Sequence, residues 1–235
     1  NCTSIDSIYV NEPSPVPVDI SSNSNIVCEG GSLVLNGSGG ISYSWSPSIW
    51  LNSSTGSSVV TNPNSSISYI LTANDIYGCS NNDTIDIIVT PSISLSANLI
   101  SPTICYGESV NININGATTY SWLPNNGVNV TSQGQAIVSP NTTTNYLVIG
   151  TNNSGCIDTI NISVNVLPQP IVSINNNSII CEGESISLFA NGASTYYWYP
   201  STSLNNNIGS TVLASPNSSV NYYVVGTDVN GCHDT

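Results

Sequence analysis

Apolar and polar residues alternate in short stretches throughout this chain. The clearest stretch runs from Val110 to Asn115 and reads Val-Asn-Ile-Asn-Ile-Asn. Similar stretches begin at Leu33 and Ile186, and further ones cover residues 69–73 and 85–89. A period of two residues is typical of strands with one buried face, and no stretch shows the 3.6-residue period of a helix. The pattern therefore predicts an all-β protein.

Turn signals separate these stretches. Asn-Gly pairs occur within or just after the alternating stretches, at residues 36–37, 115–116 and 191–192. Glycine readily adopts the positive φ angle that tight hairpin turns require. Short strands with turn signals about every ten residues are typical of a β-sandwich of the immunoglobulin-like class.

The sequence is built from repeats. Each unit opens with Cys-x-Gly-x-Ser, and the opening cysteines Cys28, Cys105 and Cys181 are almost evenly spaced along the chain. A tryptophan, a tyrosine and a closing Gly-Cys pair follow each opening cysteine, and each of them does so at the same distance in all three units. The matched residues are Trp45, Trp122 and Trp198; Tyr69, Tyr146 and Tyr222; and Cys79, Cys156 and Cys232. Matches at fixed spacing in three copies indicate a tandem array.

Proline-bearing linkers set the predicted boundaries, because proline stiffens a joint and keeps neighbouring strands from pairing across it. We expect tandem immunoglobulin-like β-sandwich repeats of about 77 residues, arranged head to tail. Residues 13–90, 91–168 and 169–235 form the first, second and third repeat, the third lacking its last strand. Residues 1–12 match the end of a unit and are expected to be the last strand of a preceding repeat, so the chain reads as a window of a longer array.

Charge narrows the range of functions. The chain has 13 acidic residues, no Lys or Arg, and a formal net charge of −13. Without cations it lacks the main source of affinity for nucleic acid and for anionic membrane surfaces, and mechanisms that need a Lys or Arg are excluded. Its apolar runs fall short of the ~18 residues of a membrane-spanning helix. We expect no nucleic-acid partner and no membrane insertion.

Seven cysteines without a Cys-x-x-Cys motif indicate disulfides and an oxidising location, secreted or at the cell surface. Two pairings use six of the seven. Pairing within each repeat joins Cys28–Cys79, Cys105–Cys156 and Cys181–Cys232, and leaves Cys2 to pair upstream. Pairing across each joint instead joins Cys2–Cys28, Cys79–Cys105 and Cys156–Cys181.

Constant spacing favours pairing within a repeat. The spacing of the two cysteines is identical in all three repeats, whereas the spacing across a joint is one residue shorter at the last joint than at the first two. A change in length is tolerated more easily in a linker than in a packed unit. One geometric difficulty stands against this choice. The two turns that carry the cysteines lie at opposite ends of an ordinary seven-strand sandwich, and a disulfide needs Cα atoms within ~7 Å.

Tryptophan occurs in two settings. The three repeated tryptophans are expected to pack in the core between two sheets, because a position shared by all copies serves the shared fold. Trp50 occurs only in the first unit, inside the most variable segment, between Pro47 and Pro63. It is therefore the candidate ligand contact, for example with a surface glycan.

Groups suited to catalysis are scarce in the sequence. The only histidine, His233, has no counterpart in the other units, and Glu182 and Glu184 share one turn rather than facing each other across a cleft. We predict that the chain is not an enzyme and has no cofactor. A loosely bound Ca²⁺ ion would use carboxylates together with backbone carbonyls, and the candidate carboxylates are Asp75, Asp228 and Glu29.

The set of motifs resembles a known family. Cys-x-Gly-x-Ser at Cys28, Tyr-x-Trp-x-Pro from Tyr43, Asn-Pro at residues 62–63 with Tyr69 further on, and Gly-Cys at residues 78–79 are similar to the Ig-like/PKD-like repeats of very large surface proteins in Bacteroidota. The resemblance covers the whole chain. It implies a secreted cell-surface array, exported by the type IX system and associated with adhesion or gliding. Repeats of this family usually contain some Lys and Arg, so their absence here departs from the pattern.

A second motif fits that resemblance. Bacteroidota O-glycosylate Ser or Thr in Asp-Ser/Thr-apolar sequences, which implies candidate O-glycosylation at Ser7, Thr84, Thr159 and Thr235. The alternative is structural: the Asp side chain caps the turn that enters a strand. Both interpretations stay open at this point.

These observations predict a non-enzymatic structural repeat segment of a long extracellular surface adhesin or filament. The alternatives are a glycan-binding module that uses its variable loops, and a self-assembling fibre or sheath subunit. The expected partners are further repeats of the same chain, other copies in a homo-oligomeric filament, and surface glycans.

Overall fold

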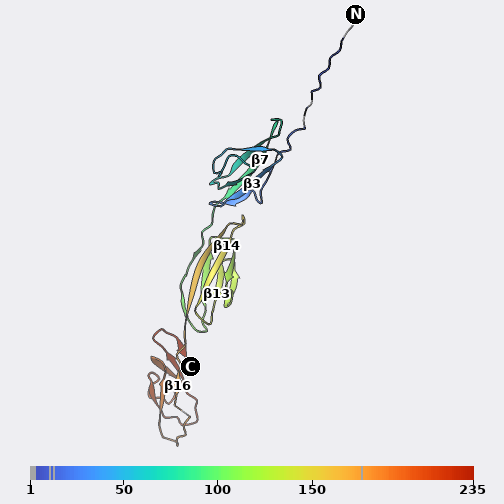
Figure 1. Ribbon diagram of the computed structural model, residues 1–235. Coiled ribbons are helices and arrows are strands. Elements are labelled where there is room, and N and C mark those ends of the chain that lie inside the picture. Colours follow the sequence, from blue (N-terminus) through green and yellow to red (C-terminus); the bar gives the residue numbers. More distant parts are fainter. Residues whose placement is uncertain (1–3, 11, 13, 176) are drawn as a thin grey trace. The chain divides into compact units, whose positions relative to one another are not determined.

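The computed structural model describes residues 4–10, 12, 14–175 and 177–235. The described part of the chain is all-β, and it contains no helix that could cross a membrane. Each of the three repeats folds into its own immunoglobulin-like β-sandwich (Figure 1). By its internal contacts the chain forms two compact units, one made of Asn1–Ser94 with Gly150–Asp158 and the other of Leu95–Ile149 with Thr159–Thr235.

The first sandwich has sheets of three and four strands. The three-stranded sheet has the order β1 (Asp19–Ser21), β3 (Leu33–Ser38), β5 (Ser58–Thr61). The four-stranded sheet has the order β2 (Ile26–Cys28), β7 (Ser80–Thr90), β6 (Ile67–Asn74), β4 (Ser42–Ser46). β6 and β7 are antiparallel, whereas β2 pairs in parallel with the end of β7.

The second sandwich repeats this plan with four strands in each sheet. One sheet has the order β12 (Val128–Ser132), β13 (Gln135–Val138), β10 (Val110–Asn115), β8 (Ser96–Ala97). The other has the order β11 (Thr119–Leu123), β14 (Thr144–Thr151), β15 (Ile157–Leu167), β9 (Thr103–Cys105). β9 pairs in parallel with the end of β15, as β2 does with β7.

The third sandwich has fewer described strands. One sheet has the order β16 (Ser173–Ile174), β17 (Ile186–Asn191), β19 (Thr211–Ala214). The other has the order β18 (Thr195–Tyr199), β20 (Tyr223–Thr227), β21 (His233–Asp234). β21 is two residues long, where β7 and β15 have eleven residues each.

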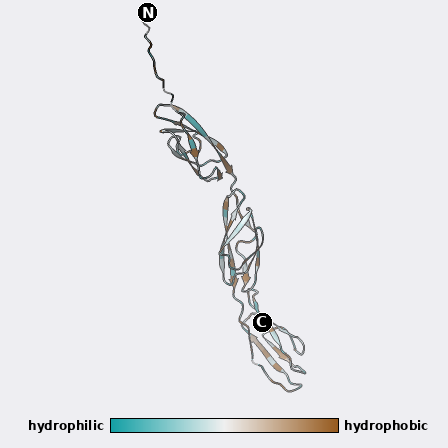
Figure 2. Cartoon of the chain, turned by 90° about the vertical axis from the view of Figure 1, so that its right-hand side faces the viewer, coloured by the Kyte–Doolittle hydropathy of each residue, from teal (hydrophilic) through white to brown (hydrophobic). Residues whose placement is uncertain are grey.

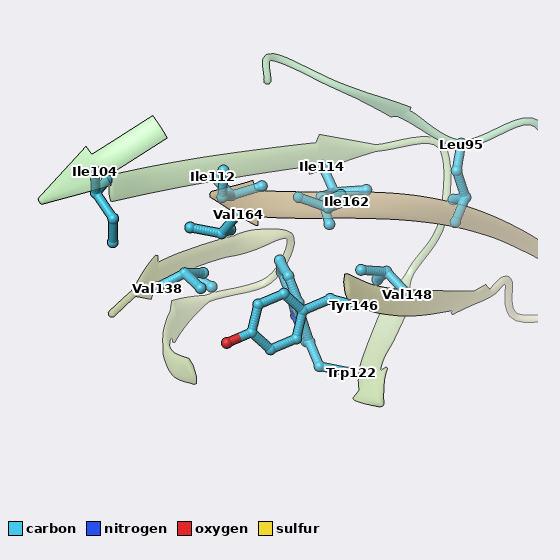
Figure 3. Packing of buried hydrophobic residues seen from close by; sticks show 11 residues of the cluster. Leu95, Ile104, Ile112, Ile114, Trp122, Val138, Tyr146, Val148, Ile162 and Val164 are labelled. Atoms are coloured by element: carbon cyan, nitrogen blue, oxygen red, sulfur yellow. The ribbon is translucent and has the colours of Figure 1, made fainter. Parts of the chain in front are cut away.

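The alternating apolar positions form one core in each sandwich. In the second sandwich the buried side chains of β10, Ile112 and Ile114, face Trp122 and Tyr146 of the other sheet (Figure 3). The rings of Trp122 and Tyr146 meet edge to face, with their centroids 5.7 Å apart. All three repeated tryptophans are buried, which confirms the predicted core role. Outside the cores, hydrophobic and hydrophilic residues are interspersed along the strands (Figure 2).

Two glycines are required where the chain approaches itself closely. Gly39 and Gly192, at equivalent positions in the first and third repeats, have φ angles of +94° and +97°. A Cβ atom at these positions would lie 2.0 Å and 1.9 Å from the carbonyl oxygens of Pro17 and Ile171. The Asn-Gly prediction therefore holds at Gly192 but is wrong at Gly37, which lies inside β3, because there the positive-φ glycine comes two residues later.

Two buried tyrosines make the stability sensitive to alkaline pH. Tyr69 Oη donates to the carbonyl oxygen of Ile49 at 2.9 Å, and Tyr146 Oη to that of Asn126 at 2.9 Å. Burial raises the pKa of both hydroxyl groups above 10.0. A pKa that is higher in the folded state stabilises the fold below the unfolded-state pKa, and this contribution disappears as the pH rises through the folded-state pKa.

We therefore expect the free energy of unfolding to fall as the pH rises above about 10. Urea titrations at a series of pH values, followed by far-UV circular dichroism, measure this. Tyr146→Phe should have a shallower alkaline loss than the wild type, since it has one buried hydroxyl fewer to ionise. An identical slope in the two proteins would contradict the assignment.

Candidate functional site

Disulfides join successive repeats. Cys28, which opens the first repeat, is bonded to Cys156, which closes the second, with Cα atoms 5.7 Å apart. Cys105, which opens the second repeat, is bonded in the same way to Cys232, which closes the third, with Cα atoms 5.5 Å apart. Each bond lies within one of the two compact units. The opening cysteine of one repeat thus pairs with the closing cysteine of the next.

The predicted pairing within each repeat is therefore wrong, and so is the alternative pairing across each joint. The predicted bonds within the repeats were Cys28–Cys79, Cys105–Cys156 and Cys181–Cys232. The reason is the length of the last strand. Cys28 lies opposite Thr90 at the end of β7, whereas Cys79 immediately precedes the first residue of β7. Eleven residues of strand span roughly 35 Å, far beyond the reach of a disulfide. The geometric difficulty seen in the sequence decides the outcome.

Each closing cysteine lies in a turn of the same kind. In the second repeat, Asn152 Oδ1 accepts from the amide of Cys156 at 2.9 Å, and the amide of Asn152 donates to the carbonyl of Cys156 at 3.0 Å. In the third repeat, Asp228 makes the same pair of hydrogen bonds with Cys232. Cys156 and Cys232 are buried. A side-chain oxygen therefore fixes the backbone from which each sulfur reaches its partner.

Among the described cysteines, Cys79 and Cys181 are free and exposed. Each has the turn that its bonded equivalents have. Asp75 Oδ1 accepts from the amide of Cys79 at 2.9 Å, as Asn152 and Asp228 do for their cysteines. The amide of Glu184 donates to the carbonyl of Cys181 at 3.1 Å, as the matching residues do after the other opening cysteines. Cys79 therefore shares its turn with Cys156 and Cys232, and Cys181 shares the turn that follows Cys28 and Cys105. Cys2, predicted to pair upstream, lies outside the described residues.

The third sandwich carries a groove along its open edge. The groove has a volume of about 570 Å³, and polar side chains such as Asn175, Asn217 and Ser219 line it together with apolar ones such as Ile180, Leu188 and Val220. Leu188 is half-buried, whereas its counterparts Leu35 and Ile112 are fully buried. In the first repeat, Ile87 of the last strand belongs to this part of the core. In the second repeat, Ile162 and Val164 of the last strand do so.

The backbone beside the groove also forms less β-structure than the matching backbone of the first two repeats. Residues 179–181, which match β2 and β9, form no strand, and β20 begins three residues later than β6 and β14 do. In the other repeats both of these segments pair with, or lie next to, the last strand. Within the described residues, β21 pairs with β20 only at Gly226 and Thr227.

The acidic side chains serve turns and strands. Asp75 and Asp228 bind backbone amides of their own turns, and Asp83 Oδ2 accepts from the amide of Ile20 at 2.9 Å. Within the described residues, no three His, Cys, Asp or Glu side chains gather as metal ligands would. The predicted loosely bound Ca²⁺, with Glu29 as a further ligand, stays a prediction.

Trp50 lies in a strained turn. Its φ angle is +62°, and its counterpart Ser203 has +64°, whereas the second repeat has Gly127 at this position. A positive φ is unfavourable for a residue with a Cβ atom. The side chain is half-buried rather than fully exposed. Its role as a ligand contact stays a prediction.

The candidate glycosylation sites are accessible. Ser7, Thr84, Thr159 and Thr235 are all exposed. Two neighbouring carboxylates also have the structural role that was the alternative, since Asp83 accepts from Ile20 and Asp234 Oδ2 accepts from the amide of Val172 at 3.4 Å. O-glycosylation at these four positions stays a prediction.

The sequence interpretation missed the groove residues and the pairing between repeats. A signal for the pairing was present: in the first two repeats the closing cysteine stands twelve positions before the proline that follows the last strand, Pro91 or Pro168. That is enough for a long strand, which places the closing cysteine at the far end of its own sandwich from the opening cysteine.

Comparison with known proteins yields structural neighbours only. No family model and no curated protein sequence matches the chain. Similar solved structures include an ice-binding, Ca²⁺-stabilised adhesin of an Antarctic bacterium, with 12% identity, 95% of this chain and 72% of that chain covered, and a TM-score of 0.36. Another is the three N-terminal domains of the bacteriophage RB49 outer capsid protein Hoc, with 11% identity, 89% and 92% covered, and a TM-score of 0.34. Fibronectin(III)-like modules of Clostridium thermocellum CbhA match with 8% identity, 64% and 95% covered, and a TM-score of 0.37. The identities and TM-scores are low, so the β-sandwich fold of this chain rests on its own sheet topology.

Proposed function

We propose that this chain is a non-enzymatic structural repeat segment of a long extracellular surface adhesin or filament. The observation that carries the proposal is the pairing of Cys28 with Cys156 and of Cys105 with Cys232. A bond inside a repeat would stabilise that repeat alone. A bond from each repeat to the next holds the array together even when the linker between the two is stretched.

The disulfides also support an extracellular location, because such bonds form and persist in oxidising compartments. The composition fits the same setting. Without any Lys or Arg, the chain offers no cleavage site to proteases of trypsin specificity. The exposed threonines of the Asp-Thr motifs would carry O-glycans, which add bulk and solubility.

The absence of Lys and Arg affects the exposed strands as well. Long exposed strands are usually protected from edge-to-edge aggregation by Lys side chains. This chain has none, and its net charge of −13 supplies mutual repulsion instead. In keeping with the sequence resemblance, we place the segment in a type IX-exported protein of the Bacteroidota kind, with repeats of the same chain as its nearest partners.

Surface labelling together with peptide mapping tests this function. An antibody raised against the chain should label intact cells of the source organism. Protein sheared from those cells and digested without reduction should yield peptides that link Cys28 to Cys156 and Cys105 to Cys232. Labelling only after permeabilisation, or peptides with free thiols at these four positions, would overturn the proposal.

A further inference from the structure

Three tyrosines are exposed on one face of the third sandwich. Tyr197 and Tyr199 of β18 and Tyr223 of β20 are 51%, 39% and 50% exposed. Tyr199 and Tyr223 lie opposite each other in the antiparallel register, and their rings stack with centroids 5.3 Å apart and planes 20° apart. The buried residues Trp198 and Val224 alternate with them, so the tyrosines point away from the core.

The face around these rings is uncharged. The other outward residues of the two strands are Thr195, Val225 and Thr227. Ile208 forms a bridge with Tyr197 at the edge of β18, and paired residues point to the same side of a sheet. Ile208 is 61% exposed. The outward residues of β18 and β20 therefore combine aromatic and aliphatic surface with hydroxyl groups, and include neither a carboxylate nor a cation.

The shared fold does not require these tyrosines. Counted from the opening cysteines, the matching residues are Ser44, Ser46 and Ile70 in the first repeat and Ser121, Leu123 and Leu147 in the second. In the first repeat the two strands pair in the same register, with Ser46 opposite Ile70 as Tyr199 lies opposite Tyr223. The sheet forms there without aromatic residues at these positions. A cluster that occurs in one repeat alone serves a purpose other than the common core.

The exposure of this face does not depend on the last strand. β18 lies on the far side of β20 from β21 in the order of the sheet. In the first repeat β7 pairs with the whole of β6, and Ile70 is still 41% exposed. The outward face of this sheet is therefore open in a repeat whose last strand is long.

Charge narrows the range of ligands for this face. With no Lys or Arg, the chain lacks the side chains that most strongly bind phosphate and carboxylate groups. A second copy carries the same net charge of −13, so two copies repel each other. A basic protein would find no carboxylate among the outward residues of β18 and β20. A neutral ligand matches an uncharged face.

We propose that Tyr197, Tyr199 and Tyr223 bind a neutral carbohydrate on the outward face of the third sandwich. The C–H face of a pyranose ring is apolar and packs on an aromatic ring, while its hydroxyl groups form hydrogen bonds at the edge. Each tyrosine serves both needs, because its ring is apolar and its hydroxyl group donates or accepts a hydrogen bond.

The site is also pre-organised. A tyrosine side chain has two rotatable bonds, so a tyrosine contact costs little conformational entropy. Stacking holds the rings of Tyr199 and Tyr223 nearly parallel before any ligand binds. The site lies on a sheet face of the third repeat and is separate from the variable loop that carries Trp50.

Affinity electrophoresis of the purified chain tests the site. The probes are the neutral polysaccharides β-glucan, xylan, mannan and dextran, and the acidic polysaccharide alginate, each cast into a native gel. The net charge of −13 drives migration, and binding retards it. We expect at least one neutral polysaccharide to retard the chain and alginate to have no effect. No retardation by any of the neutral polysaccharides, or equal retardation by alginate, would overturn the proposal.

A variant with the residues of the first repeat tests the three tyrosines. Tyr197→Ser, Tyr199→Ser and Tyr223→Ile together should keep the far-UV circular dichroism spectrum, because the first repeat folds with these residues in the same register. The dissociation constant, measured from retardation at a series of polysaccharide concentrations, should rise at least about tenfold. An unchanged dissociation constant in the folded variant would contradict the assignment.

Two control variants locate the effect. Phe189→Ala with Leu213→Ala removes exposed apolar side chains from the opposite sheet of the same sandwich, and should leave the dissociation constant within about twofold. Trp50→Ala should also leave it within about twofold. Equal weakening by the first control would show that the tyrosines are not specific, and a larger loss from Trp50→Ala would place the carbohydrate in the first repeat. Either result would overturn the proposal.

The reciprocal change adds a site to the first repeat. Ser44→Tyr, Ser46→Tyr and Ile70→Tyr together should lower the dissociation constant at least about twofold, because two sites on one chain can then bind the same polymer. This gain does not depend on how the third repeat tolerates substitution. Unchanged binding by a folded variant of this kind would count against the three tyrosines as a sufficient site.

Two further measurements identify other occupants. Light scattering that shows oligomers of the chain, lost in the Tyr197→Ser, Tyr199→Ser, Tyr223→Ile variant, would assign the face to a second copy. Binding of an oligo-arginine peptide that the same substitutions abolish would assign it to a basic protein. Either result would overturn the carbohydrate site.

A carbohydrate site goes beyond the proposed function, since a structural segment needs no ligand. The gel measurement uses the purified chain, whereas the test of the proposed function uses intact cells. Failure of the gel measurement would leave the surface labelling unaffected, and a negative labelling result would leave the retardation unaffected.

Discussion

Pulled from its two ends until fully unfolded, the oxidised chain should extend to about 290 Å, and the reduced chain to about 800 Å, at about 3.4 Å per residue of extended backbone. The difference follows from the covalent path. With both disulfides intact, the shortest route runs through residues 1–28, crosses to Cys156, returns to Cys105, crosses to Cys232 and ends at Thr235. Residues 29–104 and 157–231 lie outside this route and bear no load once the chain is taut.

Single-molecule force spectroscopy measures this length, and two matched cysteine variants identify the pairing. Cys156→Ser removes the first disulfide and should lengthen the fully extended chain to about 370 Å. Cys79→Ser removes a free thiol and should change nothing. Pairing within each repeat would lengthen the chain in both variants, so a longer Cys79→Ser chain would contradict the structure.

Trp122→Ala should cost the second sandwich about 3–5 kcal/mol of its free energy of unfolding. The tryptophan is buried, meets Tyr146 edge to face at 5.7 Å, and packs beside Ile112 and Val164 (Figure 3). Its loss removes a large buried apolar surface and leaves a cavity that the two sheets can only partly close. For a domain of this size, that is a large part of the total stability.

Urea unfolding followed by far-UV circular dichroism measures the effect. Leu123→Ala is the matched control, because Leu123 is the next residue of β11 and its side chain is 54% exposed. We expect the control to change the free energy of unfolding by no more than about 0.5 kcal/mol. Equal decreases in the free energy of unfolding in both variants would show that any substitution in β11 destabilises the sandwich, whether or not the side chain packs in the core.

The fold was predictable because its causes are local. The two-residue period of Val110–Asn115 dictates which side chains are buried, and the structure buries Ile112 and Ile114 as expected. The recurrence of Trp45, Trp122 and Trp198 at fixed spacing identifies a shared core position without any structural information. Each of these inferences needs only the sequence within one repeat.

The disulfides were not predictable in the same way, because they depend on where the strands place their ends. The sequence spacing of Cys28 and Cys79 would allow a disulfide, but the two residues lie at opposite ends of β7. The groove likewise could not be predicted from one repeat alone. By its sequence pattern Leu188 is an ordinary buried strand residue, and only the comparison with its buried counterparts Leu35 and Ile112 shows that it is less covered. Long-range placement, rather than local pattern, determines both features.

The order of the bonded cysteines along the chain has one more consequence. Cys105 lies between Cys28 and Cys156, so the two cross-linked loops overlap. A single backbone cut anywhere from residue 28 to residue 232 falls inside at least one loop, and the two fragments stay covalently attached. A single protease nick within this range would therefore leave the molecule in one piece, and a second, suitably placed cut would be needed to release a fragment.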